Sequence, residues 1–195
     1  MSMRECKTRR LLTGGAVVAG LLAAAAGTAQ AEGKGPFGLG APVEEGDLAG
    51  FTTVQPDGRG LPPGSGNVAQ GAEIYAQQCA ACHGEKLEGN PAEGIGGPVL
   101  IGGRGSLASE APKKTVESYW PYAPTLFDYV KRSMPFTSPG SLSDEEVYAV
   151  SAYILAEAGI VAGDATLDAE SLAAVEMPNR NGFIPDPRPE HQLYR

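Results

Sequence analysis

The chain has 195 residues, with 15 Lys and Arg against 23 Asp and Glu, and its formal net charge is −8. This length predicts one ordinary domain with extensions rather than two full domains. The acidic balance argues against nucleic acid and anionic membrane surfaces as partners, and it favours a protein partner with a basic docking patch.

Residues 1–31 predict a cleavable secretory signal peptide. Basic residues cluster within the first ten positions, an uncharged small and apolar stretch follows at 11–26, and a small-x-small cleavage site ends at Ala31. Cleavage would leave 11 Lys and Arg against 22 Asp and Glu, a net charge of −11. The apolar stretch is short for a retained anchor, and no later segment is long enough to cross a membrane. We therefore expect a periplasmic protein with no membrane span in the mature chain.

Residues 32–66 predict an irregular N-terminal arm. The segment is dense in Gly and Pro and shows no helical or strand period, and Pro56-Asp57-Gly58 has the composition of a turn. Its apolar residues, among them Phe37 and Leu39, are too many for a pure spacer. We expect the arm to lie against the domain or a partner.

A helix is predicted from an Asn67 N-cap into Cys79. Gly71 lies inside it, where Gly costs up to about 1 kcal/mol relative to Ala. This cost predicts a close approach of another helix at Gly71. Tyr75 is the aromatic residue expected at that crossing.

The run Cys79-Ala80-Ala81-Cys82-His83 has the Cys-x-x-Cys-His form that attaches a c-type haem. Positions i, i+3 and i+4 of a helical turn share one face, so Cys79, Cys82 and His83 can all point at one flat cofactor. The two thiols would form thioethers with the haem vinyl groups. The imidazole would then be the proximal ligand of the iron.

Two cysteines at this spacing can also serve other purposes. A structural zinc site needs four ligands, yet no Cys follows Cys82 and His191 is the only other His. A thioredoxin-like pair needs a βαβ setting, which the neighbouring sequence does not predict. A simple disulfide stays open, because an exported protein can form one.

The remaining elements follow in chain order. Residues 96–105 are too rich in Gly for a helix or central strand and predict an irregular loop. Residues 124–133 predict a helix with Pro124 in its first turn, ended by Met134-Pro135. A late helix is predicted from Asp144 to about Ala158, with Ser143 and Glu146 as a capping box.

This late helix is the expected partner of Gly71, with Tyr153 packed on Tyr75. Its apolar stripe predicts a buried face, and Gly159 predicts the end of the helix.

A sixth iron ligand is expected from a methionine, as in many electron-transfer cytochromes. Only Met134 and Met177 remain after signal removal. Met134 lies in a loop before the late helix and can return across the haem face opposite His83. Met177 lies in a Pro-rich tail, where Met is more often a packing residue. We favour Met134 and keep Met177 as the competitor.

The order of these motifs resembles a class I cytochrome c, an all-α fold around one covalent haem c with irregular N- and C-terminal extensions. The resemblance implies a cytochrome domain at 67–160 and a C-terminal extension at 161–195. It further implies that the Pro98 carbonyl accepts a hydrogen bond from His83. It makes Arg104 a candidate for a haem propionate, and Trp120 or Tyr122 a candidate for the haem rim.

A narrower resemblance covers nearly the whole mature chain and concerns the cytochrome subunits of Sox-type sulfane dehydrogenase and of related sulfite dehydrogenases. It is carried by five motifs: Phe37-Gly38-Leu39-Gly40, Pro56-Asp57-Gly58-x-Gly60-Leu61-Pro62, Ser118-Tyr119-Trp120-Pro121-Tyr122-Ala123, Met134-Pro135-Phe136 and Met177-Pro178-Asn179-x-x-Gly182-Phe183. In that family the cytochrome pairs with a molybdenum-cofactor subunit. One Cys-x-x-Cys-His motif corresponds to a single-haem form.

These implications predict an electron-transfer subunit rather than a catalyst by itself. It would accept electrons from a molybdenum-cofactor dehydrogenase subunit and pass them to a downstream cytochrome c or oxidase. The alternatives are a general electron shuttle without a dedicated enzyme partner, and a haem enzyme or gas sensor with an open sixth position.

Overall fold

The computed structural model describes residues 37, 39–48, 53–90 and 96–188. The predicted signal peptide at 1–31 and His191 lie outside these residues. The chain divides into two units, Met1–Leu48 and Ala49–Arg195. In the first unit a short 3-10 helix, η1 (Glu45–Leu48), follows a segment with three exposed apolar side chains, Phe37, Leu39 and Val43.

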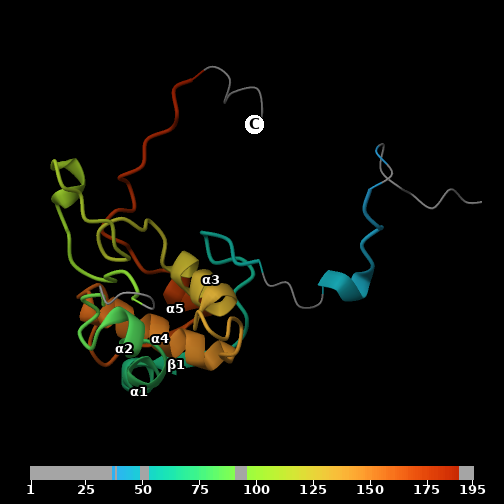
Figure 1. The fold of residues 1–195 in the computed structure, drawn as a ribbon, viewed down its shortest axis with the longest axis horizontal. Helices are drawn as coiled ribbons and strands as arrows, with labels where there is room; N and C mark the ends of the chain where they lie inside the picture. The colour runs from blue at the N-terminus through green and yellow to red at the C-terminus, as the bar shows by residue number, and fades with distance from the viewer. Residues whose placement is uncertain (1–36, 38, 49–52, 91–95, 189–195) are drawn as a thin grey trace, which may run out of the picture. The chain divides into compact units, whose positions relative to one another are not determined.

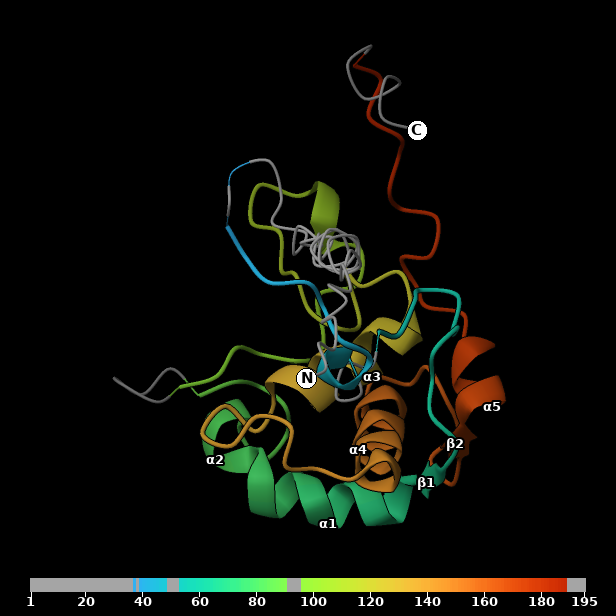
Figure 2. The same ribbon diagram turned by 90° about the vertical axis from the view of Figure 1, so that its right-hand side faces the viewer.

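The second unit is helical, with one short two-stranded ribbon (Figures 1 and 2). Its elements are β1 (Ser65–Asn67), α1 (Val68–Gln78), α2 (Ala80–His83), the 3-10 helix η2 (Ser106–Ala108), α3 (Ala123–Ser133), α4 (Asp144–Glu157), β2 (Thr166–Asp168) and α5 (Ala169–Ala173). The all-α expectation is therefore confirmed, apart from this ribbon. Among the helices that the structure describes, none is long and apolar enough to cross a bilayer.

The crossing of α1 and α4 is the main helix packing of the domain (Figure 2). A Cβ on Gly71 would lie 1.9 Å from the Ala149 carbonyl oxygen, so only glycine permits this approach. The rings of Tyr75 and Tyr153 pack at the same crossing, with centroids 5.1 Å apart. The predicted helix contact is confirmed.

Both helices begin as their sequences predict. The Asn67 side chain accepts a hydrogen bond from Gln70 N, and the Gln70 side chain accepts one from Asn67 N. Ser143 and Glu146 make the same reciprocal pair at the start of α4. Such caps satisfy backbone donors that have no partner within the helix.

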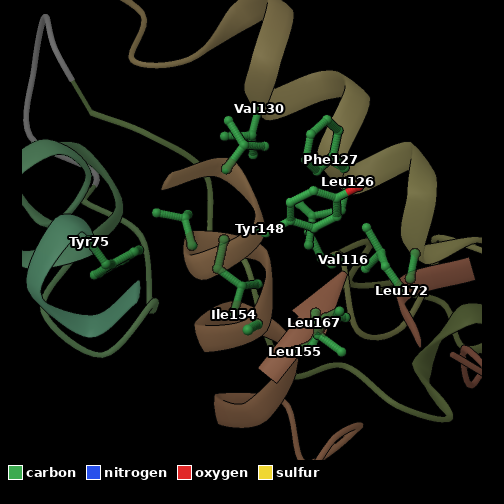
Figure 3. Packing of buried hydrophobic residues seen from close by; sticks show 14 of the residues in the cluster. Tyr75, Val116, Leu126, Phe127, Val130, Tyr148, Ile154, Leu155, Leu167 and Leu172 are labelled. Carbon is green, nitrogen blue, oxygen red and sulfur yellow. The ribbon is translucent and has the colours of Figure 1, made fainter. Parts of the chain in front are cut away.

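The core lies where α3 packs on α4. Phe127 of α3 faces Tyr148 of α4 in Figure 3, and their ring centroids are 4.5 Å apart. The Tyr148 hydroxyl donates to the Pro62 carbonyl over 2.8 Å, and Val54 and Leu61 pack against the core. Residues 53–64 of the expected arm therefore lie against the domain.

The C-terminal extension, expected to be irregular, contributes ordered structure. β2 pairs antiparallel with β1, with Gly66 opposite Leu167. Leu167, Leu172 and Met177 are buried in the same core as α3 and α4. The sequence did not predict these elements, because a strand of three residues and a helix of five are too short to show a period.

Candidate functional site

A cavity of about 510 Å³ opens between α1, α2, α3, α4 and the loops around residues 97–100 and 114–120. Cavities of roughly 300–1,000 Å³ are typical of cofactor and ligand sites. Most of its wall is apolar or aromatic: Tyr75, Val99, Leu100, Val116, Trp120, Leu126, Tyr129, Val130, Met134, Phe136, Leu142, Val150 and Ile154. The shape and lining suit a large, flat, mainly apolar group.

The end of α1 and the single turn of α2 bring Cys79, Cys82 and His83 to this cavity. The amides of Cys82 and His83 both donate to the Cys79 carbonyl, over 3.0 and 2.9 Å. Gly84, with φ of +81°, then turns the chain away from the helical path. The three side chains named by the motif therefore share one wall.

Residues 97–98 contact the His83 ring on its Nδ1 side. Its Nδ1 lies 2.8 Å from the Pro98 carbonyl oxygen, which leaves Nε2 without this partner. A Cβ on Gly97 would lie 2.8 Å from both Cε1 and Nδ1 of the ring. Since a carbonyl can only accept, Nδ1 carries the proton and Nε2 has the lone pair a metal needs.

Both cysteines are free thiols in the structure. Burial, together with the nearby Cys82, raises the pKa of the Cys79 thiol to about 11. An apolar wall of this kind disfavours a free thiolate and suits an uncharged thioether.

Another part of the cavity wall is formed by the end of α3 and the segment after it. Met134 is the C-cap of α3, and its amide donates to the Val130 carbonyl over 3.0 Å. The Lys131 Nζ contacts the Leu142 carbonyl oxygen and Asp144 Oδ1, each at 2.8 Å. These contacts tie the end of α3 to the start of α4. Met134 thus faces the cavity that Cys79, Cys82 and His83 also line.

The two candidate methionines are placed differently. Met134 is half-buried on the cavity wall, whereas Met177 is 3% exposed and lies in the hydrophobic core. Met177 does not line the cavity. The structure therefore leaves Met134 as the methionine that can reach a group bound there.

Of the residues predicted to contact the haem rim or a propionate, the structure places only some at the cavity. Trp120 lines the cavity and packs edge-on against Tyr129, with centroids 5.6 Å apart. Tyr122 lies under the Arg180 guanidinium instead, at 4.5 Å, and is not on the cavity wall. The structure brings Trp120 to the site and leaves Tyr122 outside it.

Arg104 is not brought to the cavity. Its Nε pairs with Glu117 Oε1 at 2.6 Å, and its Nη2 donates to the Ala158 carbonyl at the end of α4 over 2.6 Å. These contacts join the Gly-rich loop to α4. In this structure the guanidinium serves the fold of the loop.

The sequence did not predict several of the residues that line the cavity. Tyr129, Phe136, Leu142 and Lys114 line the same cavity as Met134 and Trp120. Leu126, Tyr129 and Val130 have the i, i+3, i+4 spacing of one helix face, and this spacing could have placed Tyr129 at the cavity. No period marks Lys114, since it lies in an irregular segment.

Comparison with known proteins adds three matches. The family model for cytochrome c matches residues 68–157. Thiosulfate dehydrogenase of Stutzerimonas stutzeri (strain A1501) is 36% identical over 95 residues, which are 48% of this chain and 28% of that protein. A chain in the crystal structure of the sulfane dehydrogenase SoxCD from Paracoccus pantotrophus is 45% identical, with a TM-score of 0.70, over 81% of this chain and 77% of that chain.

Proposed function

Because this chain belongs to the cytochrome c family, we propose that it is a periplasmic monohaem cytochrome serving a molybdenum-cofactor dehydrogenase of sulfur compounds. It would accept electrons one at a time from that subunit and pass them to a downstream cytochrome c or oxidase. The cytochrome itself is an electron carrier related to chains of sulfur-compound dehydrogenases.

The extent of the match to the SoxCD chain is the observation that carries this proposal. The cytochrome c model accounts for residues 68–157, less than half of the chain. The match to SoxCD covers 81% of the chain at 45% identity, so it includes segments outside the cytochrome core. A general shuttle would have no need of shared extensions, whereas a subunit with a dedicated partner would.

The cofactor is a covalently bound haem c, which supplies a one-electron Fe(II)/Fe(III) couple. Cys79 and Cys82 would hold it through thioethers, and His83 would present Nε2 to the iron. The Pro98 carbonyl fixes the imidazole tautomer and orientation by accepting from Nδ1. Met134 would supply the sixth ligand and Trp120 would pack on the haem rim.

A His and Met ligand pair favours the reduced iron, so a comparatively high potential is expected. The acidic chain would attract a basic partner surface, and this attraction would weaken with salt.

Two segments are proposed to contact the dehydrogenase subunit. In the first unit, Phe37 and Leu39 are 85% and 80% exposed. In the tail, Ile184 is 87% exposed, directly after residues that pack on the domain. Apolar side chains left in solvent on terminal segments suit burial by a partner.

The test uses material purified from the native periplasm. The haem absorption spectrum is recorded after addition of sulfite, thiosulfate or a sulfane donor, with the isolated cytochrome as control. Reduction only when a molybdenum subunit co-purifies would support the proposal, and the active substrate would identify the type of dehydrogenase. A cytochrome that purifies alone and is reduced by none of these compounds would point to the general shuttle.

The contact segments are tested separately by co-purification. Deletion of residues 32–48 and the substitution Ile184→Asp are each expected to weaken complex formation without changing the haem spectrum. Retention of a full complex in either variant would reject that segment as a contact.

A further inference from the structure

Lys114 is the only side chain with a permanent positive charge among the described residues lining the cavity, and none of the lining residues is Asp or Glu. Most of the other residues that line the cavity are apolar, so a cation stands out among them. An ammonium at the edge of an apolar pocket attracts a negative group placed there and can donate hydrogen bonds to it.

The backbone around Lys114 is held by a small hydrogen-bond network. The Thr115 hydroxyl donates to the Gly102 carbonyl over 2.7 Å, and the Ser118 hydroxyl donates to the Lys113 carbonyl over 2.6 Å. Thr115 and Ser118 are both buried. Lys114 therefore projects from a fixed turn rather than from a loose loop.

The ammonium itself is not committed to a carboxylate. Within the part of the chain that the structure describes, Lys114 makes no ion pair, and its Nζ lies 5.3 Å from the Tyr119 ring centroid. Arg104, by contrast, is paired with Glu117. Of these two cations, Lys114 is the one that lines the cavity, and it does so as an exposed residue without a carboxylate partner among the described residues.

We propose that Lys114 binds a haem propionate and thereby raises the reduction potential of the haem. The vinyl and propionate groups occupy different edges of a porphyrin, so the propionate partner must come from an element other than the 79–83 segment. Lys114 comes from the 113–118 turn, which meets this requirement. A positive charge beside the haem disfavours the additional positive charge of the oxidised iron. The inference rests on the haem c cofactor and is independent of which enzyme donates electrons.

The test is optical potentiometry on the isolated holoprotein, with no partner present. Lys114→Gln is expected to lower the potential, shifting the oxidised-to-reduced ratio at fixed potential about threefold to tenfold. A tenfold shift corresponds to about 59 mV for one electron. Lys114→Arg, which keeps the charge, is expected to restore most of the potential.

Lys113→Gln is the matched control, because Lys113 is a neighbour that is exposed like Lys114 but does not line the cavity. It removes the same net charge and is expected to move the potential much less. Equal shifts of the reduction potential in Lys113→Gln and Lys114→Gln would show that only the net charge matters, and this result would overturn the proposal. So would an unchanged potential in Lys114→Gln with a normal haem spectrum.

Discussion

Two parts of the cavity wall are held by different kinds of interaction. The His83 wall, residues 79–84 and 97–100, is fixed by backbone hydrogen bonds, with the Gly97 amide 2.7 Å from the Cys82 carbonyl oxygen and Leu100 N 2.9 Å from the Leu87 carbonyl oxygen. The Met134 wall, residues 129–142, faces the cavity mainly with apolar side chains, and Phe136 at its edge is 80% exposed.

The contrast teaches which side of the site tolerates change. Packed backbone leaves no room for an added atom, and a displaced carbonyl leaves a buried donor unpaired. Apolar contacts tolerate substitutions that conserve volume. We therefore expect substitutions on the His83 wall to affect folding and those on the Met134 wall to affect haem properties.

The largest loss of stability is expected from Gly97→Ala. The new Cβ would lie 2.8 Å from the His83 ring and 3.0 Å from the Cys82 carbonyl oxygen. The free energy of unfolding should fall by about 1–3 kcal/mol or more in denaturant titrations. Gly163→Ala, which meets no atom within 4 Å, is the control. Equal stability of the two variants would contradict the rigidity of the His83 wall.

Met134→Leu should change the haem more than the fold. Volume is conserved, so the packing cost should stay below about 1.5 kcal/mol. Loss of the thioether ligand should lower the reduction potential, alter the absorption spectrum and open the iron to carbon monoxide. Met177→Leu, in the core, serves as control and should leave these properties unchanged. A six-coordinate spectrum and normal potential in Met134→Leu would remove Met134 as the ligand.

A smaller effect is expected for Tyr75→Phe on the His83 side. The Tyr75 hydroxyl donates to the Gly84 carbonyl over 2.8 Å, and its loss should cost about 0.5–1.5 kcal/mol.

The same residue predicts a pH dependence. Burial raises the pKa of Tyr75 above its ordinary value of 10.0. The folded state therefore keeps a proton that the unfolded state releases, so this contribution to stability is complete below pH 10 and falls as the pH rises above it. The variant should lack this alkaline component when unfolding is measured against pH. If the free energy of unfolding fell in parallel for both proteins above pH 10, Tyr75 would not be the cause of the alkaline loss of stability.

Phe136→Ser should have the smallest effect on stability. The side chain is 80% exposed, so the change in unfolding free energy should stay within about 0.5 kcal/mol. Because Phe136 lines the mouth of the cavity, reduction of the haem by the dehydrogenase should slow. Stopped-flow absorbance measures this rate, and the potential of the variant, expected to be unchanged, is the control. An unaltered rate would show that electrons enter elsewhere.

The sequence predicted the features that depend on local signals. Asn67 predicted a helix start as an N-cap and Ser143 predicted one as a capping box with Glu146, and both caps are present. Gly71 in a helix interior predicted a close helix contact, which α4 provides. The Cys-x-x-Cys-His run predicted three side chains on one face, and all three line the cavity.

The sequence could not predict features that depend on distant partners. Pairing of β1 with β2 joins segments about a hundred residues apart through three residues each. Arg104 and Lys114 are both cations near the Gly-rich loop, and only the fold decides that Arg104 meets Glu117 while Lys114 meets the cavity. Local composition carries no information on that choice.

The separation of α1 from α4 along the chain has a consequence for the order of maturation. α4 supplies Val150 and Ile154 to the cavity wall, yet it follows the cysteine motif by most of the domain. Closing so long a loop is slow relative to local helix formation. Pulsed thiol labelling during refolding of the haem-free chain would then find Cys79 and Cys82 reactive until α4 packs. The connectivity therefore predicts that both thiols stay accessible for haem attachment until α4 packs.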